Sequence, residues 1–402
     1  MKTNNNIPAY RFQGYTGAWE LRKLGEVAEK QFGGGTPTTS NDLFWEGNIP
    51  WIQSSDLEEG VFSVAPRKYI TKYGLNNSSA QLIPKNSIAI VTRVGVGKIA
   101  LMPFSYTTSQ DFLSISHLKT NELFTVYALY IKLQNEIKVL QGTSIKGITK
   151  NELLIKEIPI PTLPEQKAIG TFFSTLDRQI TLHQRKLDTL KEQKKTYLKL
   201  LFPAKGQIKP ALRFQGFEDD WKEVKLGECI EDYVEKTTKQ NQYPVLTSSQ
   251  NQGIVFQENY FANRQVTTEN NIGYFVLPRG YFTYRSRSDN GKFRFNRNDL
   301  IDKGIISYFY PVFSIKYGDS NFFLFLLNSR LEKEVDIAAE GTGQRVLSLK
   351  KFKNISIILP SLPEQEAIGT FFQTLDQKIT QVEDKLTSLK EMKKTLLRKL
   401  FV

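Results

Sequence analysis

The sequence predicts an α+β protein with two tandem β-rich globular domains, each followed by a long helix. The two helices are expected to pair as an antiparallel intramolecular coiled coil, giving a dumbbell with pseudo-twofold symmetry. Three observations lead to this prediction. An 18-residue stretch occurs twice with 14 identical positions, as LPEQKAIGTFFSTLDRQI from Leu163 and LPEQEAIGTFFQTLDQKI from Leu362. Both domains also open alike, and a heptad pattern of apolar residues runs through both terminal segments.

The domain openings are PAYRFQGYTGAWELRKLGE from Pro8 and PALRFQGFEDDWKEVKLGE from Pro210. Between the repeated ends, sparse matches survive at one shared offset of 194 residues, such as Arg93 with Arg287. A single offset indicates duplication of one unit. The predicted segments are a first domain (1–162), a first helix (163–205), a second domain (206–361) and a second helix (362–402).

The interiors of the domains have the composition of short strands. Ser87 to Met102 predicts two strands around a glycine turn, and Gly304 to Tyr317 is rich in aromatic and β-branched residues. Thr36 to Trp51 contains many turn formers and is expected to be a long loop. Shorter helices are expected at Phe124 to Leu140 and at Phe322 to Val335.

The long helices begin at Pro164 and Pro363, because proline needs no hydrogen-bond acceptor at the first helical position. Pro203 and Gly206 end the first helix. About 38 residues at ~1.5 Å per residue make a rod of ~57 Å. Apolar steps of three and four residues define a coiled-coil seam. The predicted seam residues are Ile169, Phe173, Leu176, Ile180, Leu187, Leu190, Ile368, Phe372, Leu375, Ile379, Leu386 and Leu389.

An exposed seam of this length needs a partner, and the other copy in the same chain is the simplest one. The alternative is that each helix packs on its own domain. Lys194, Lys393 and His183 interrupt the seam, either to set its register, to contact a partner or as solvated side chains. Gly170 and Gly369 indicate close packing, against a partner protein or between the helices.

The composition favours a nucleic-acid partner. The 402-residue chain has a formal net charge of +13, which suits an acidic partner such as nucleic acid or an anionic membrane surface. Cys229 is the only cysteine, so no disulfide can form within the chain. No apolar signal core or run of ~18 apolar residues is present. A cytoplasmic protein is therefore expected.

Catalytic motifs are missing where they would be expected. TRVGVGK, from Thr92, lacks the first glycine of a P-loop and has Ile99 where that motif needs serine or threonine. No Pro-Asp dipeptide of a metal-dependent nuclease occurs, and no methyltransferase or dinucleotide motif is found. With only His117 and His183 present, a His/Cys metal cluster is excluded. A Ser-His-Asp site on His117 stays open, although a surface position at a strand end is the better interpretation.

Basic residues interleaved with aromatic ones predict DNA binding, because cations contact phosphates and arginine can bind guanine edges. The clearest example is YRSRSDNGKFRFNR, from Tyr284. Polar residues near the matched positions add candidates for base contacts. The predicted DNA-binding residues are Ser54, Lys85, Arg93, Lys98, Gln110, Ser248, Gln250, Asn251, Arg279, Tyr284, Arg285, Arg287, Lys292 and Arg294.

This arrangement resembles the specificity (S) subunits of type I restriction-modification systems. The resemblance covers almost the whole chain and includes GGGTPTTSNDLFWEGNIPWIQSSDL from Gly33, GTSIKGITKNELLIKEIPIPTLPEQKAI from Gly142 and GTGQRVLSLKKFKNISIILPSLPEQEAI from Gly341. It implies that each domain is a target-recognition domain, and that the helices space these domains and dock methyltransferase (M) subunits. Restriction/translocase (R) subunits would join the assembly.

The resemblance also implies that this chain has no active site or cofactor, and that S-adenosylmethionine, ATP and Mg²⁺ belong to the partners. The expected target is double-stranded DNA with two unlike half-sites and an unread spacer, in which the partner methylates adenine after flipping the base. A ~57 Å rod spans at most ~17 base pairs, and overlap brings the half-sites nearer one turn, ~34 Å. The rival hypotheses are a stand-alone two-headed DNA-binding scaffold or regulator without methyltransferase partners, and a self-contained nuclease or methyltransferase.

Overall fold

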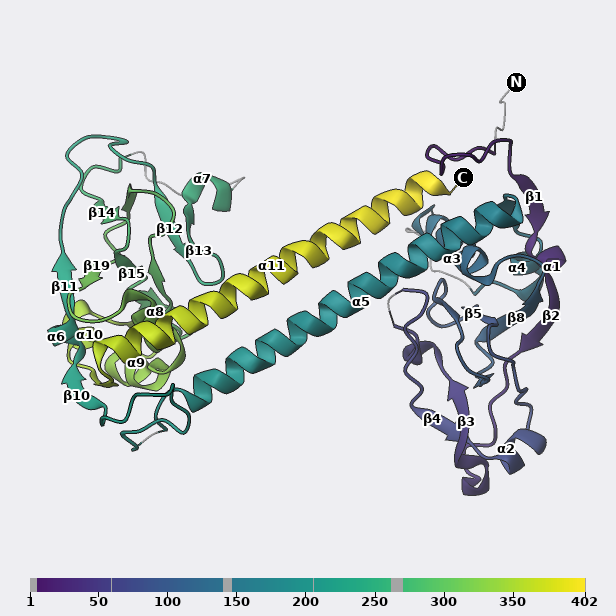
Figure 1. The fold of residues 1–402 in the computed structure, drawn as a ribbon, viewed down its shortest axis with the longest axis horizontal. Coiled ribbons are helices and arrows are strands. Elements are labelled where there is room, and N and C mark those ends of the chain that lie inside the picture. Colours follow the sequence, from purple (N-terminus) through teal and green to yellow (C-terminus); the bar gives the residue numbers. More distant parts are fainter. Residues whose placement is uncertain (1–5, 59, 140–146, 205, 262–269, 402) are drawn as a thin grey trace. The chain divides into compact units, whose positions relative to one another are not determined.

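The computed structural model describes residues 6–58, 60–139, 147–204, 206–261 and 270–401. The chain divides into two compact units, Met1–Gln184 with Asp384–Val402, and Arg185–Glu383. Each unit therefore contains one globular domain and part of each long helix, α5 (Leu163–Leu200) and α11 (Leu362–Leu400). The predicted α+β class with two β-rich domains and two long helices is confirmed (Figure 1).

The first unit is built around a four-stranded antiparallel sheet in the order β2-β8-β5-β6. A three-stranded sheet, β4-β3-β7, and the pair β1-β9 complete its strands. The elements are β1 (Glu20–Lys23), α1 (Leu24–Val27), β2 (Ala28–Gly33), η1 (Asp42–Phe44), β3 (Trp45–Ile52), η2 (Ser54–Asp56), β4 (Lys68–Ile70), α2 (Lys72–Asn76), β5 (Ile88–Val91), β6 (Ile99–Leu101), β7 (Thr107–Thr108), β8 (Phe112–Leu118), α3 (Glu122–Val139), α4 (Lys150–Leu154) and β9 (Glu157–Ile160).

The second unit repeats this plan, with a four-stranded sheet in the order β11-β19-β15-β17 and the pair β10-β21. Three two-stranded pairs are added, β12-β13, β14-β18 and β16-β20. The elements are β10 (Lys222–Lys225), α6 (Leu226–Cys229), β11 (Ile230–Tyr233), β12 (Leu246–Ser249), β13 (Gly253–Phe256), α7 (Gln257–Tyr260), β14 (Phe275–Pro278), β15 (Phe282–Tyr284), β16 (Arg287–Ser288), β17 (Phe295–Arg297), β18 (Lys303–Ile306), β19 (Val312–Ile315), α8 (Ser320–Ser329), α9 (Glu332–Ala338), β20 (Arg345–Val346), α10 (Leu349–Lys353) and β21 (Ser356–Leu359).

The strands predicted in Ser87–Met102 and Gly304–Tyr317 are confirmed, whereas the long loop predicted at Thr36–Trp51 is wrong in its second half. There β3 spans eight residues, because its aromatic and branched side chains pack on β4 and outweigh the turn-forming Gly47. The helix predicted at Phe322–Val335 is two helices, α8 and α9, which are separated at Arg330 and Leu331.

Each long helix is joined to the opening of its domain by a buried ion pair. Arg11 donates from Nε and Nη2 to the two carboxylate oxygens of Glu165, at 2.6 and 2.7 Å. Arg213 and Glu364 repeat the arrangement at 2.8 and 2.6 Å. The carboxylates are 0% and 1% exposed, and in each pair both oxygens are bound by the arginine in a bidentate manner. The hydrogen bond to Glu165 raises the pKa of Arg11.

The first turn of each long helix also holds the start of a shorter helix. Asn121 donates its backbone N–H to Gln166, and Asp319 donates likewise to Gln365. A Cβ on Gly170 would lie 2.7 Å from the backbone nitrogen of Phe124, at the start of α3. A Cβ on Gly369 would lie 2.8 Å from that of Phe322, in α8. Both glycines therefore allow contact with their own domain, and the prediction of packing on a partner or between the long helices is wrong.

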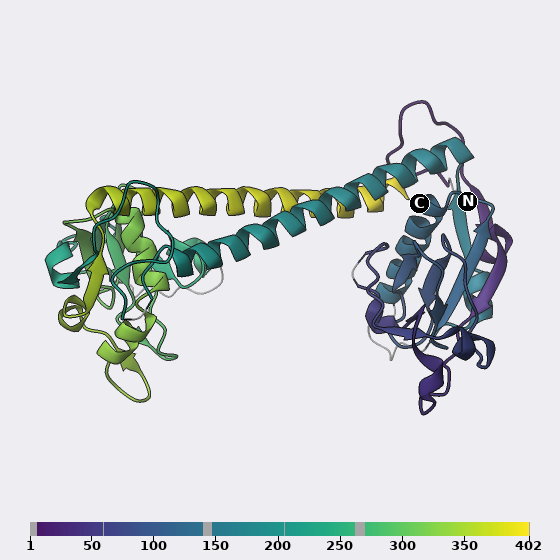
Figure 2. The ribbon, with the colours of Figure 1, turned by 60° about the horizontal axis from the view of Figure 1, so that its bottom comes forward.

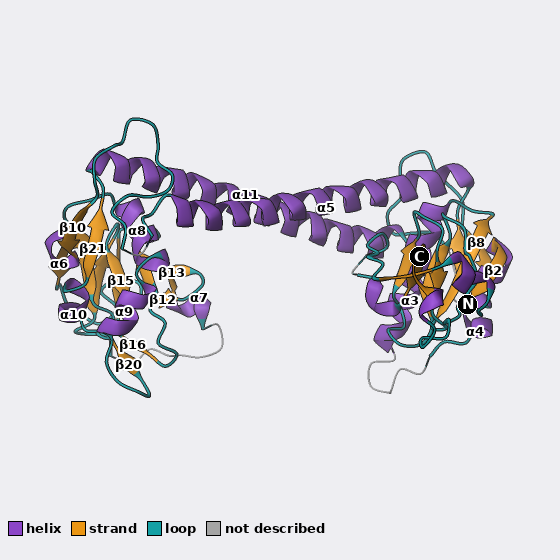
Figure 3. Ribbon diagram, turned by 90° about the horizontal axis from the view of Figure 1, so that it is seen from below, coloured by secondary structure: helices purple, strands orange, loops and turns teal. Residues whose placement is uncertain are grey.

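The two long helices pack side by side and antiparallel within each unit, as the paired ribbons in Figures 2 and 3 show. In the first unit Lys393 binds Asp177 at 2.5 Å, and in the second Lys194 binds Asp376 at 2.6 Å. The two lysines that interrupt the seam therefore form ion pairs across the helix pair. His183 is half-buried and its Nδ1 lies 2.8 Å from the Gln179 carbonyl.

The predicted seam residues lie between the paired helices or on the adjoining domain. All are buried except Ile180 and Leu190, which are half-buried. Asp177 is further bound by the hydroxyl of Tyr127, which donates to it at 2.6 Å. Burial and the nearby Asp177 carboxylate raise the pKa of Tyr127 far above its ordinary value, so the hydroxyl remains a donor at neutral pH.

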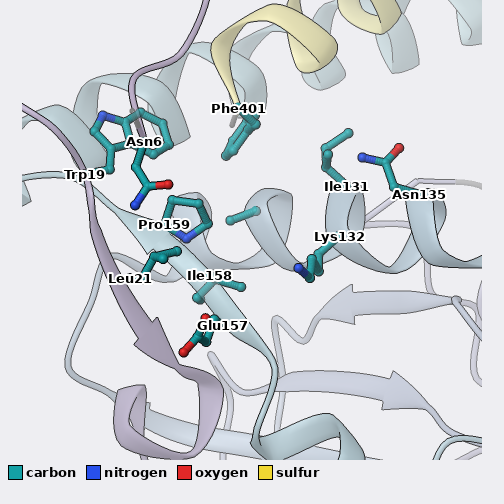
Figure 4. A pocket seen from close by; sticks show the side chains of 11 residues that line it. Asn6, Trp19, Leu21, Ile131, Lys132, Asn135, Glu157, Ile158, Pro159 and Phe401 are labelled. Atoms are coloured by element: carbon teal, nitrogen blue, oxygen red, sulfur yellow. The ribbon is translucent and has the colours of Figure 1, made fainter. Parts of the chain in front are cut away.

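The core of each domain is completed by the end of the helix that follows the other domain. In the first unit, Phe401 packs on Trp19 and Phe124, with ring centroids 6.3 and 5.6 Å away. Figure 4 shows Phe401 pointing from the end of α11 toward Pro159, beside a cavity of about 270 Å³. Phe202 packs in the same way in the second unit, on Trp221 at 6.0 Å and Phe322 at 5.4 Å.

This packing predicts that Phe401→Ala destabilises the first domain, although the residue follows the second domain in the chain. Loss of a buried phenyl ring should reduce the free energy of unfolding by about 3–5 kcal/mol. Hydrogen exchange measured by mass spectrometry should then quicken in α3 and leave α8 unchanged. Phe202→Ala is the matched control and should reverse the pattern; faster exchange in α8 for Phe401→Ala would contradict the assignment.

Candidate nucleic-acid interface

Several of the candidate DNA-binding residues lie on equivalent loops of the two sheets. In the first domain the loop 92–98 joins β5 to β6, and in the second the segment 285–294 joins β15 to β17. Strands β5 and β15 hold the same place in their sheets, so Arg93 and Arg287 follow equivalent strands. The 194-residue offset fails after that point, because the second segment is longer. Lys98 directly precedes β6 as Arg294 directly precedes β17, so Arg294 rather than Lys292 is the structural counterpart of Lys98.

The loop 92–98 is held at both ends. Lys98 donates from its ammonium group to the carbonyl oxygens of Ser54 and Leu57, at 2.9 and 2.8 Å. At the other end, Thr92 accepts a hydrogen bond from Ile148 at 2.7 Å. The Lys98 ammonium therefore has one N–H left for a phosphate, and its main effect is to order the loop. Ser54 is half-buried and contributes its backbone to this bond.

Between these fixed ends, Arg93 and Val94 are exposed, with Val94 at 71%. The tip borders a cleft of about 850 Å³. Gln110 lines the same cleft and accepts a hydrogen bond from the Thr36 hydroxyl at 2.5 Å. Two of the predicted residues, Arg93 and Gln110, are thus brought together, whereas Lys85 is exposed but does not line this cleft.

In the second domain, Gln250 and Asn251 are exposed in the turn between β12 and β13. The Ser249 hydroxyl accepts the backbone N–H of Asn251 at 3.2 Å, which orders the turn. Ser248 is half-buried and accepts a hydrogen bond from the Asn296 amide at 2.8 Å. Gln250 and Asn251 are therefore free to approach DNA, while Ser248 is already engaged with β17.

Of two further predicted DNA-binding residues, Tyr284 is buried and Arg279 forms an ion pair at the surface. Tyr284 is 0% exposed in the centre of its sheet and donates to the Leu347 carbonyl at 3.2 Å. Burial raises its pKa far above the ordinary value, so the hydroxyl stays protonated. Arg279 binds the Asp302 carboxylate at 2.9 Å and the Asp299 carbonyl at 2.8 Å. The first residue cannot reach DNA, and the charge of the second is neutralised within its turn.

The remaining basic residues of the segment 285–294 differ in their contacts. Arg285 and Lys292 are exposed, and Arg287 is exposed with its guanidinium carbon 4.8 Å from the centre of the Phe309 ring. Arg294 lies close enough to the carboxylates of Asp376 and Glu332 to interact with them electrostatically. Arg294 is exposed as well, so all four cations are accessible to a ligand, although the charge of Arg294 is partly balanced by these carboxylates.

Phe309 was not expected at this site from the sequence. It lies in an aromatic pair with Tyr308, whose ring centroid is 4.3 Å away and which is 61% exposed. The one signal in the sequence was the aromatic run SYFYP at residues 307–311, and this composition equally predicts a strand. Phe309 is more than twenty residues from Arg287 in the sequence, so no local pattern indicates the contact between them.

The site offers groups for binding and few for chemistry. Across the residues with described positions, no group of three or more His, Cys, Asp and Glu side chains is placed to hold a metal ion. His117 is exposed near the end of β8, with Nδ1 2.9 Å from the Ser116 hydroxyl.

None of the described helices is long and apolar enough to cross a membrane.

Comparisons with known proteins place both units in one family. The family described as the type I restriction modification DNA specificity domain matches residues 17–192 and 218–391. The type I restriction enzyme MjaIX specificity subunit of Methanocaldococcus jannaschii is 24% identical over 95% of this chain and 92% of its own length. The EcoR124I/EcoR124II specificity subunit of Escherichia coli is 32% identical over 46% of this chain and 48% of its own.

The solved structure of the type I restriction-modification S subunit from M. genitalium aligns over 98% of this chain and 99% of its own. Its TM-score is 0.63 at 19% sequence identity, so the fold is shared.

The geometry of the first-domain loop predicts that Arg93→Ala weakens DNA binding without unfolding the domain. Loss of one contact should reduce affinity about 10-fold for duplexes that the wild-type chain selects from a randomised library. The free energy of unfolding should change by less than about 0.5 kcal/mol, because the side chain is exposed.

Tyr284→Phe is the matched control for a buried residue. It should lower the free energy of unfolding by about 1 kcal/mol, through loss of one hydrogen bond, and leave DNA affinity unchanged. If Tyr284→Phe bound DNA more weakly at unchanged stability, the Tyr284 hydroxyl would have to contact DNA.

Proposed function

The chain belongs to the family of type I restriction-modification DNA specificity domains, and from this premise we propose that it is the sequence-specific DNA-recognition subunit of a type I restriction-modification enzyme. Each globular domain binds one half of a bipartite, asymmetric target. The observation that carries this proposal is the double match of the family, once to each unit. The two domains share their central sheets but differ in the loops that present Arg93 and Arg287, so the two half-sites differ.

The predicted contacts divide between the half-sites. Arg93 and Gln110, with Lys85 and Lys98 as further cations, serve the first half-site. Gln250, Asn251, Arg285, Arg287 and Lys292 serve the second. The support is exposure together with fixed loop ends, as seen for the turn after β12 and for loop 92–98. Arginine and the carboxamides can bind base edges, while the lysines suit phosphates.

We assign the catalytic steps of methylation and cleavage to partner proteins. We place adenine methylation on methyltransferase subunits that dock on the long helices, and DNA translocation and cleavage on restriction subunits. S-adenosylmethionine, ATP and Mg²⁺ then bind to those partners rather than to this chain. A subunit that recognises chromosomal DNA would act in the cytoplasm. The S-subunit relatives support the existence of such partners, and the docking faces on α5 and α11 are part of the proposal.

A stand-alone DNA-binding scaffold is the second candidate. It would share the two-domain architecture, and would differ in needing no methyltransferase. Incubation of the purified chain with DNA, S-adenosylmethionine and Mg²⁺ should give no methylation or cleavage under either hypothesis. Turnover by the chain alone would instead establish a self-contained enzyme.

Mapping methylated adenines across the host genome, with and without this gene, tests the proposal directly. One bipartite motif should lose its methylation when the gene is deleted, because the methyltransferase would no longer find that target. Restoring the gene should restore the same motif. If no motif changes while the methyltransferase is shown to be expressed, the scaffold hypothesis gains and the proposal fails.

Exchange of residues 220–340 for the matching segment of another family member tests whether the domains act independently. The exchanged chain should direct methylation to a target with one new half-site and one old half-site, because the first domain and its loop are untouched. Sequencing of the methylated motif provides the measurement. A change in both half-sites would contradict recognition by separate domains.

A further inference from the structure

The arginines of the second domain, residues 206–361, can be sorted by the partners of their guanidinium groups. Most of those with described positions are occupied inside the unit. The occupied ones are Arg213 with Glu364, Arg279 with Asp302, Arg297 with Asp299, Arg330 with the Pro203 carbonyl, and Arg345 with Asp336. Arg294 interacts with Asp376 and Glu332. Within the described part of this domain, Arg285 and Arg287 are the exposed arginines without a carboxylate or carbonyl partner.

Arg287 differs from Arg285 in being held by an aromatic ring. Its guanidinium carbon lies 4.8 Å from the centre of the Phe309 ring. A cation–π contact at this distance restrains the guanidinium, whose N–H groups make no hydrogen bond to the other described residues. The backbone is restrained as well, since Ser286 donates its N–H to the Phe309 carbonyl at 2.9 Å and accepts from Leu347 at 2.9 Å.

The surroundings of Arg287 are apolar and exposed. Tyr308, next to the stacking ring, is 61% exposed. Val346, opposite Arg287 in the β16-β20 pair, is 38% exposed. These apolar neighbours leave the guanidinium less hydrated than a cation surrounded by water, which favours its use in hydrogen bonds to a base edge. A phosphate is better served by a flexible cation in water, which describes Arg285 and Lys292.

The edge of a restrained guanidinium matches one base in particular. Two parallel N–H groups of arginine can donate together to O6 and N7 of guanine in the major groove, and no other base presents two acceptors there. Because Phe309 already orders the guanidinium, less conformational freedom is lost on binding than for an unsupported arginine.

We propose that Arg287, held on Phe309, recognises one guanine in the half-site bound by the second domain. This proposal rests on the proposed function, because it concerns the same DNA-binding face. Phe309 acts as a positioning residue and makes no base contact of its own.

The test uses the assembled complex of this chain with its methyltransferase partner. DNA carrying the methylated motif, randomised in the second half-site, is methylated by each variant, and the products are sequenced. For the wild type, one position should be restricted to guanine. Arg287→Ala should reduce the preference for guanine at that position about 10-fold or more and leave every other position unchanged. Arg287→Lys should also relax it, because lysine cannot form the two parallel bonds.

Two further variants separate base recognition from other roles. Arg285→Ala should lower methylation evenly across all sequences and reduce the salt dependence of binding, as expected of a phosphate contact. Phe309→Leu keeps the backbone bond to Ser286 and should relax the same guanine position as Arg287→Ala, to a smaller extent.

The outcomes that overturn the inference are distinct from those that overturn the proposed function. An even loss across all sequences for both Arg287→Ala and Arg287→Lys makes Arg287 a phosphate contact. Unchanged specificity removes it from the interface. In either case the wild-type motif survives, so only the guanine assignment fails. If the wild-type complex methylates no bipartite motif, the proposed function itself fails.

Discussion

The buried ion pair between an opening arginine and the first turn of a long helix is the constraint on which each unit depends. Glu165 and Glu364 carry charges that the interior would not tolerate without Arg11 and Arg213. A bidentate bond fixes orientation as well as distance, so the direction in which each helix leaves its domain is defined at its base. The adjoining glutamine bonds and glycine contacts then act on a helix whose start is already in place.

The two units share their main structural contacts and differ in their loops. The sheets, the ion pairs and the lysine–aspartate bonds along the helices recur in both units and form a common frame. The loops that leave equivalent strands differ, since Arg93 lines a cleft and Arg287 lies against an aromatic ring. Under the proposed function, a change of DNA target would require new loops and no change in this frame.

The repeat made much of the fold predictable, because the starts of the helices, the seam and the strands around the glycine turn all have local signatures. Close contacts between residues far apart in the sequence have no local signature. The contact of Gly170 with the start of α3 was therefore not predicted. The candidate site was less predictable. The composition around β15 indicated DNA-binding residues, but Tyr284 is buried and Arg279 forms an ion pair, whereas Arg287 is exposed beside an aromatic ring. Burial and ion pairing across the sheet decide which cations remain available, and neither is a property of local sequence.

The position of Phe401 has a consequence for the order in which the protein is made. During synthesis the first domain emerges early, yet the ring that fills the space between Trp19 and Phe124 is added only after the second domain has been translated. Until then the growing chain carries an uncovered aromatic surface of the kind that chaperones bind. The second domain has no such delay, since Phe202 precedes it. The domain that is translated first is therefore the last to complete its core. A product that ends before Phe401 leaves this aromatic surface uncovered and so remains a substrate for proteases.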